Sequence, residues 1–158
     1  MELKDIKDAT LVWGALSAET VKLLKKTARA VVVPEIRPAL VGLYHNAPLL
    51  RKADIEVVCC CDNVVGLLFY KGKISKTVLC YKRQVAAGVV ARAGSLYAAL
   101  LSKLHKVPVE AVLEGNVDCQ GVDKDVSTLG GRRLIGEDDC TRFVIKPDDE
   151  VLGEEVLR

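Results

Sequence analysis

Short apolar runs alternate along the chain with stretches in which apolar residues recur every three or four positions. The runs are rich in β-branched residues, have the length of buried strands, and lie at residues 10–14, 30–34, 55–61, 77–81 and 107–113. Helical periodicity follows Ser17, a favourable N-cap residue, and returns at residues 40–52, 64–70 and 88–104. Strands separated by such helices form right-handed βαβ units. The pattern therefore predicts an α/β fold, a Rossmann-like three-layer domain with a mainly parallel sheet.

Two of these helical stretches carry further expectations. Pro48 lies inside the stretch at residues 40–52 and should kink or split that helix. The stretch at residues 88–104 is apolar on most sides, which is typical of a helix at a domain centre or an oligomer interface. After about Glu114 the chain is rich in glycine and aspartate, and we predict irregular structure with one strand at residues 142–145.

Composition favours one domain over residues 1–158. Apolar residues make up 50% of the 158 residues and aromatic residues only 4%, so the core must be aliphatic, as in a parallel sheet covered by helices. The net charge of +2 is too close to neutral to indicate direct nucleic-acid binding. No apolar run is long enough to span a membrane, and the N-terminus does not have the form of a signal peptide. We therefore expect a cytoplasmic protein with no membrane partner.

The six cysteines do not indicate a metal site. Cys59, Cys60 and Cys61 are consecutive in a predicted strand, so their side chains alternate between the two faces of the sheet. The other three cysteines stand alone, without a C-x-x-C pair. We expect free thiols that pack as small apolar groups, with no metal and no cofactor.

The loop after the second strand places charge where α/β sheets bind ligands. Glu35 and Arg37 follow that strand, between Pro34 and Pro38. Because Pro38 restricts Arg37 to an extended conformation, the guanidinium should leave the strand end in a defined direction. Ligands of open α/β sheets bind outside the carboxyl ends of the strands. The alternative is a surface ion pair between Arg37 and Glu35.

A phosphate site is the chemistry that these loops suggest. Gly94 and Ser95 are expected to open the long helix, where free N–H groups and the positive end of the helix dipole favour an anion. Arg92 and Arg37 would then clamp phosphate oxygens, and Asp62 would accept hydrogen bonds from sugar hydroxyls. The alternatives are close helix–sheet packing at Gly94 and Ser95, and an Asx-turn or helix N-cap at Asp62.

Lys82 is a weak candidate for a catalytic residue. At the tip of a central strand, a desolvated amine would be suited to imine or base chemistry. It would serve equally as a third phosphate-binding cation or as a solvated loop lysine. His105 lies near the end of the last long helix, where we interpret it as a cap rather than a base.

Four segments in order carry a family resemblance. They are E-I-R-P at residues 35–38 followed by Gly42, A-P-L-L-R-K-A-D-I-E-V at residues 47–57, C-D-N at residues 61–63, and V-A-R-A-G-S at residues 90–95 running to K-L-H-K-V-P at residues 103–108. These resemble segments of the family that contains initiation factor 2B subunits, methylthioribose-1-phosphate isomerase and ribose-1,5-bisphosphate isomerase. The resemblance covers about residues 10–113, and more loosely the remainder. It implies the Rossmann-like C-terminal domain of that family and a phosphate site.

The catalytic residues of the family's isomerases are not matched. Their cysteine at the end of the first strand falls within residues 11–14, which read L-V-W-G, and their fourth-strand aspartate falls at Lys82. Ala91 stands where they have an asparagine, Val41 stands where they have a glutamine, and their N-terminal helical region is not matched. The resemblance therefore implies the fold and a phosphate site, and argues against the isomerase reaction.

We accordingly expect a binding or regulatory protein for a phosphorylated small molecule, a sugar phosphate or nucleotide, related to initiation factor 2B subunits and lacking isomerase activity. One alternative is an enzyme, an isomerase or lyase, that acts on a phosphorylated sugar. Another is a protein-interaction module. We also expect a homodimer, because the stretch at residues 88–104 carries more apolar surface than one sheet face covers.

Overall fold

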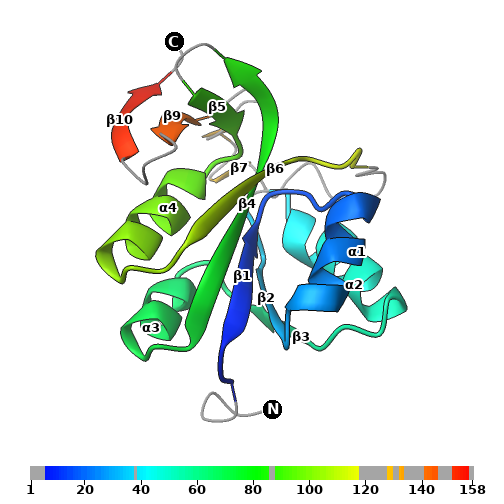
Figure 1. The fold of residues 1–158 in the computed structure, drawn as a ribbon. Helices are drawn as coiled ribbons and strands as arrows, with labels where there is room; N and C mark the ends of the chain where they lie inside the picture. Colours follow the sequence, from blue (N-terminus) through cyan, green and yellow to red (C-terminus); the bar gives the residue numbers. More distant parts are fainter. Residues whose placement is uncertain are drawn as a thin grey trace.

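The computed structural model describes residues 6–37, 39–85 and 88–117, together with the backbone of four strands beyond residue 127. Its centre is a parallel sheet with the strand order β3-β2-β1-β4-β6 (Figure 1). These strands are β3 (Val57–Cys60), β2 (Val31–Pro34), β1 (Ala9–Trp13), β4 (Ile74–Val85) and β6 (Val109–Leu113). The predicted mainly parallel sheet is confirmed.

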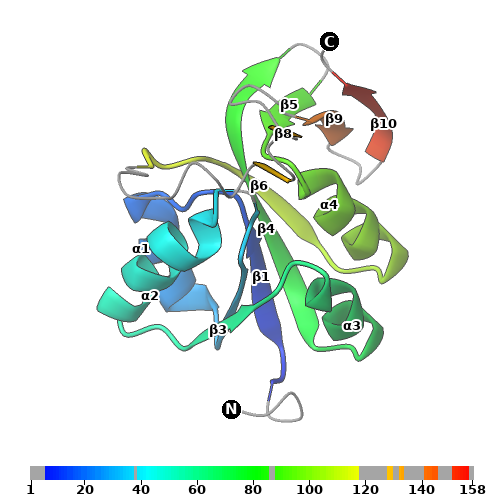
Figure 2. The ribbon, with the colours of Figure 1, turned by 180° about the vertical axis from the view of Figure 1, so that it is seen from behind.

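Helices cover both faces of this sheet, which gives three layers (Figures 1 and 2). α1 (Ala18–Thr27) and α2 (Ala47–Lys52) lie on one face, and α3 (Val64–Tyr70) and α4 (Ser95–Leu104) lie on the other. Because successive strand residues point to opposite faces, Leu11 packs in the core beneath α3 and α4, whereas Val12 packs in the core beneath α1 and α2. No helix in the described part of the chain is long and apolar enough to cross a membrane.

α1 begins and ends as its sequence predicts. The hydroxyl of Ser17 accepts a hydrogen bond from the Thr20 backbone N–H at 3.2 Å, which confirms Ser17 as the N-cap. Glu19 lies in the first turn, and Lys25 and Lys26 lie in the last turn, where each charge is favourable next to the helix dipole.

The predicted helix at residues 40–52 is split into two kinds of helix. A π-helical turn, η2 (Gly42–Asn46), leads into α2. Pro48 lies in the first turn of α2, a position that tolerates proline. The split therefore falls just before Pro48.

The prediction of one helix over residues 88–104 was wrong in its first part. β4 is longer than the predicted strand at residues 77–81, and its end pairs antiparallel with β5 (Gly88–Ala91). β5 in turn pairs with β9 (Thr141–Ile145), so residues 88–91 are held on both sides by strands, one of them distant in sequence. β9 confirms the strand predicted at residues 142–145, but the prediction of only one strand in this part of the chain was wrong. β10 (Val151–Val156) extends this antiparallel region, and β7 (Thr128–Leu129) pairs separately with β8 (Arg132–Arg133).

Candidate functional site

The loops that follow the parallel strands meet at the carboxyl edge of the sheet, where β4 continues upward into its hairpin with β5 (Figure 1). Backbone hydrogen bonds join these loops to one another. The Gly115 N–H donates to the Ala15 carbonyl at 3.0 Å, and the Glu35 N–H donates to the Cys60 carbonyl at 3.0 Å. The edge is therefore a connected platform, located where open α/β sheets bind ligands.

Asp62 fixes the loop after β2. Its Oδ1 accepts the Ile36 N–H at 2.7 Å, and its Oδ2 accepts the Arg37 N–H at 2.9 Å. Ile36 needs this support because its φ of +56° is unusual for a β-branched residue. The N-cap of α3 is Asn63, so the alternative of an N-cap at Asp62 was wrong. Asp62 is a clamp between two strand ends, and a contact with a sugar hydroxyl stays a prediction.

Arg37 forms the surface ion pair that was the alternative interpretation. Its Nε donates to Glu35 Oε2 at 2.8 Å, and its side chain is 59% exposed. The hydrogen bond from Arg37 to Glu35 raises the pKa of the guanidinium above its ordinary value. Exposed pairs of this kind contribute little stability, so the pairing leaves Arg37 free to turn toward a ligand.

Arg92 lies in a second and more buried ion pair, which the sequence analysis missed. Its Nε donates to Glu114 Oε1 at 2.7 Å, and the two side chains are 22% and 8% exposed. The same carboxylate oxygen accepts the Ala15 N–H at 3.3 Å, from the loop after β1. The available signal was the position of Glu114, directly after the strand predicted at residues 107–113.

Gly94 lies in close contact with the sheet, which was the alternative interpretation of this residue. Its φ is +84°, and a Cβ at this position would overlap the indole of Trp13. The Trp13 Nε1–H donates to the Ala93 carbonyl at 3.0 Å, so the indole fixes the turn that precedes α4. Glycine is required here by its contact with β1.

Ser95 begins α4, as expected for the opening of the helix. The side chain is fully buried, and its Oγ has no hydrogen-bond partner within the described ranges. The Ser95 N–H donates to the Arg92 carbonyl at 3.1 Å, while the N–H groups of Leu96 and Tyr97 have no acceptor in that same part of the chain. Open donors and a buried unpaired hydroxyl at a helix start are what an anion site offers.

Asn46 is a second residue that the sequence analysis missed. It is fully buried at the end of η2, where its Oδ1 accepts the Leu16 N–H at 2.9 Å and its Nδ2 donates to the Gly14 carbonyl at 2.7 Å. His45 Nε2 lies 2.9 Å from the Leu16 carbonyl oxygen. These contacts fix the loop after β1. The available signal was an amide inside an otherwise apolar helical pattern.

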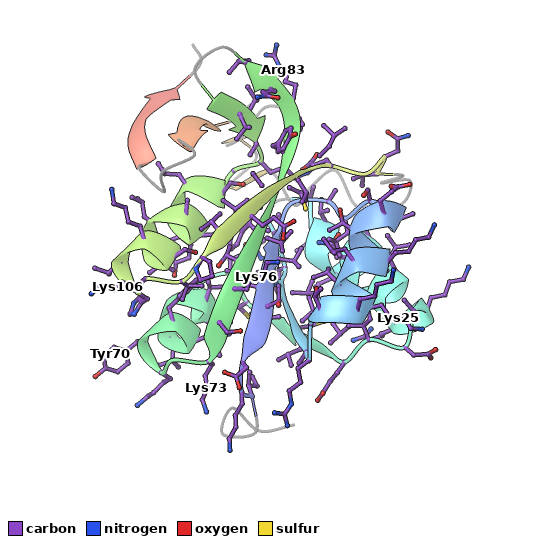
Figure 3. The ribbon with its side chains drawn as sticks, in the orientation of Figure 1. Lys25, Tyr70, Lys73, Lys76, Arg83 and Lys106 are labelled. Carbon is purple, nitrogen blue, oxygen red and sulfur yellow. The ribbon has the colours of Figure 1, made fainter. Side chains whose placement is uncertain are left out.

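The structure does not support the desolvated amine proposed for Lys82. The strand does not end there but continues to Val85, and the Lys82 side chain is exposed. The register of β4 against β5 shifts between Tyr81 and Arg83, and Arg83 projects outward from the β4–β5 hairpin (Figure 3). Lys82 is therefore the solvated lysine of the alternative interpretation.

The described cysteines are free thiols in contrasting surroundings. Cys59 and Cys61 are exposed, whereas burial raises the pKa of Cys60 to about 12 and also raises the pKa of the buried Cys80. Among the residues that the structure describes, no group of three or more metal-ligating side chains comes together. Cys119 and Cys140 lie outside the described residues.

The sequence model of the Initiation factor 2 subunit family matches residues 3–117, which include every residue of the carboxyl edge described above. The chain belongs to this family. The resemblance drawn from four short segments is thereby confirmed.

Individual relatives match parts of the chain. A methylthioribose-1-phosphate isomerase of Oleidesulfovibrio alaskensis is 37% identical over 84 residues, which cover 52% of this chain and 24% of that protein. A putative methylthioribose-1-phosphate isomerase of Methanocaldococcus jannaschii is 35% identical over 119 residues, which cover 68% of this chain and 36% of that protein. The chain therefore spans only about a quarter to a third of the length of these relatives.

Solved structures share the fold. The delta subunit of translation initiation factor eIF-2B from A. fulgidus has a TM-score of 0.63 at 17% identity, over 85% of this chain and 47% of that chain. A 5-methylthioribose 1-phosphate isomerase from Pyrococcus horikoshii has a TM-score of 0.59 at 16% identity, over 85% of this chain and 45% of that chain. Both solved structures thus share the Rossmann-like α/β fold of this chain.

Proposed function

We propose that this family member binds a phosphorylated small molecule at the carboxyl edge of its sheet and acts as a binding or regulatory protein without isomerase activity. The observation that carries the proposal is the start of α4, where Arg92 precedes the buried, unpaired hydroxyl of Ser95. A phosphate there would receive hydrogen bonds from a guanidinium, a hydroxyl and first-turn N–H groups.

The relatives support the class of ligand. Proteins named methylthioribose-1-phosphate isomerase act on a phosphorylated sugar, and two of them are 35–37% identical to this chain over the parts that match. Arg37 and Asp62 extend the proposed site from the neighbouring strands β2 and β3, with Gly94 shaping the turn. We therefore propose a sugar phosphate as the ligand class, with a nucleotide as the alternative.

Loss of Arg92 or Arg37 should weaken phosphate binding. Arg92→Gln and Arg37→Ala each remove a charge-assisted hydrogen bond, and each should cost ~1.5–3 kcal/mol of binding free energy. Isothermal titration with ribose 5-phosphate measures this cost, and a rise in Tm with ligand checks it independently. Arg83→Ala, an exposed arginine on the β4–β5 hairpin, is the matched control and should bind like the unaltered protein. Equal affinity in all four proteins would contradict the proposed site.

Isomerase activity of the family's known kind should be absent. β1 leads into Trp13 and Gly14, and β4 carries Tyr81 and Lys82, so neither a thiol nor a carboxylate occupies the two catalytic positions. Positioned acid–base groups contribute ~10²–10⁴-fold each, and loss of both should leave no useful rate. Incubation with methylthioribose-1-phosphate and with ribose-1,5-bisphosphate, followed by NMR, is the measurement. A related isomerase run in parallel is the control, and turnover above buffer background would refute this prediction.

A second copy of the chain is the protein partner that we propose. Residues 88–91 are a strand and do not form this surface, which consists of exposed apolar side chains of α3 and α4. These are Leu67, Tyr70, Tyr97, Leu100 and Leu104, and Tyr70 points away from the molecule in Figure 3. Tyr97 contacts α3 at Gly66, so the two helices contribute to one surface.

Light scattering should give twice the monomer mass of 17.1 kDa at micromolar concentration. A stable dimer buries more than ~1,000 Å² in total, and a central charge should disrupt it. Leu104→Glu, at a side chain that is 74% exposed, should therefore shift the protein to monomer, whereas Leu23→Glu on α1 should not. A monomer mass for the unaltered protein would end this proposal.

A further inference from the structure

The side chains of Arg92 and Glu114 lie side by side at the carboxyl edge, and each has polar atoms that make no hydrogen bond to the described residues. Arg92 contacts Glu114 through Nε alone, so its Nη1 and Nη2 are open, and Glu114 Oε2 is open beside them, as judged over the described residues. Ser95 Oγ is fully buried, and among the described residues it has no hydrogen-bond partner. The side chains of Arg92 and Glu114 are 22% and 8% exposed, so the pair lies at the edge of the buried interior rather than fully inside it.

The position of Glu114 is fixed by the backbone around it. Its own N–H donates to the Tyr81 carbonyl at 2.8 Å, and its Oε1 accepts the Ala15 N–H in addition to Arg92. A Cβ on Gly14 would lie 3.1 Å from the same oxygen, so the loop after β1 packs directly on the carboxylate. Glu114 is thus held in place when a ligand approaches.

The negative charge of Glu114 affects which anions can bind beside Arg92. A carboxylate that is only 8% exposed acts on its neighbours with little screening, and Glu114 already neutralises Arg92. A bare phosphate is attracted by Arg92 and repelled by Glu114 over similar distances. A ligand that carries a hydroxyl beside its phosphate avoids this conflict, because the hydroxyl donates to Oε2 while the phosphate accepts from Arg92.

We propose that Glu114 is a specificity-determining residue that makes this edge select polyhydroxylated phosphates over inorganic phosphate. The inference rests on the proposed phosphate site and adds Glu114 as the group that recognises the sugar hydroxyls. Glu114 accepts a sugar hydroxyl, disfavours an anion that brings no donor, and orients Arg92 toward the phosphate.

Titration calorimetry with ribose 5-phosphate, propyl phosphate and inorganic phosphate tests the inference. The unaltered protein should bind ribose 5-phosphate ~10-fold or more tightly than propyl phosphate, which has the same anion without hydroxyls. Glu114→Gln removes the charge and keeps the shape, so it should bind inorganic phosphate more tightly and lose most of that ~10-fold preference. Glu110→Gln, on β6 just before Glu114 and paired with Lys76 at the surface, should keep the preference.

The outcomes separate the two proposals. Equal affinity of the unaltered protein for ribose 5-phosphate and propyl phosphate would overturn the role of Glu114 and leave phosphate binding intact. An undiminished preference in a folded Glu114→Gln variant would do the same. Failure of the unaltered protein to bind any of the three compounds would overturn the phosphate site, and the inference with it. The comparison of the two ligands on the unaltered protein decides the matter even where the variant does not fold.

Discussion

Alanine at position 42 should prevent stable folding. A Cβ on Gly42 would overlap the carbonyl oxygen of Pro34 and would lie 3.1 Å from the side chain of Val33. Both neighbours belong to β2, which is buried between β1 and β3, so neither can move without disturbing the parallel sheet. Overpacking usually costs ~1–3 kcal/mol, and a collision with fixed backbone should exceed that range. Urea denaturation followed by circular dichroism measures the loss in the free energy of unfolding.

Gly66→Ala is the matched control. The nearest atom to a Cβ on Gly66 is the hydroxyl of Tyr97 at 2.8 Å, the far end of a side chain that can turn aside. Gly66 lies inside α3, where alanine favours the helix by ~1 kcal/mol. We expect Gly66→Ala to be as stable as the unaltered protein or slightly more so. Equal stability of the Gly42 and Gly66 variants would show that the π-helical turn does not press on β2.

The contact between Gly42 and β2 illustrates which parts of the fold the local sequence pattern predicts and which it does not. Strand and helix order followed from apolar periodicity, because the central strands β1 and β2 are buried on both faces and the helices are buried on one. Ser17 caps α1 and Val64 begins α3 where the pattern indicated. The π-helical turn at Gly42 was not predicted. It depends on the close approach of Gly42 to β2, and the local spacing of apolar residues contains no information about that distance.

β5 was mistaken for helix for a related reason. Residues 88–91 are apolar and continue into the apolar helix α4, so period alone does not separate the two elements. Pairing separates them, because β5 lies between the end of β4 and β9, about fifty residues further along the chain. When a run is apolar at nearly every position, local periodicity does not distinguish strand from helix. A strand such as β5 is then recognised only from its pairing partner, which is distant in sequence.

The sequence names Arg92, Gly94 and Ser95 as neighbours in the chain, and a ligand at these residues stays a prediction. The contacts that hold them were not predicted, because they come from distant parts of the chain. Glu114 lies 22 residues after Arg92, and Asp62 lies 26 residues after Ile36. The partners of Glu114 are set by the neighbouring positions of β6, β4 and β1, and those of Asp62 by the pairing of β2 with β3. This strand order follows from the assembled sheet rather than from any motif.

Alanine at position 46 should produce the second large effect. The amide of Asn46 makes two hydrogen bonds to the loop after β1, and its removal leaves the Leu16 N–H and the Gly14 carbonyl buried without partners. Each orphaned group costs ~1–3 kcal/mol, so Asn46→Ala should lower the free energy of unfolding by ~2–5 kcal/mol. Urea denaturation at neutral pH measures this.

Asn63→Ala separates this effect from loss of any asparagine. Asn63 is exposed at the N-cap of α3 and makes no side-chain hydrogen bond there, so its replacement should change stability by less than ~1 kcal/mol. The loop held by Asn46 also supplies the Ala15 N–H that Glu114 accepts. Asn46→Ala should therefore weaken binding of ribose 5-phosphate even at temperatures where the variant is folded, whereas Asn63→Ala should not. Unchanged stability and unchanged binding in Asn46→Ala would mean that the loop after β1 keeps its position without the amide.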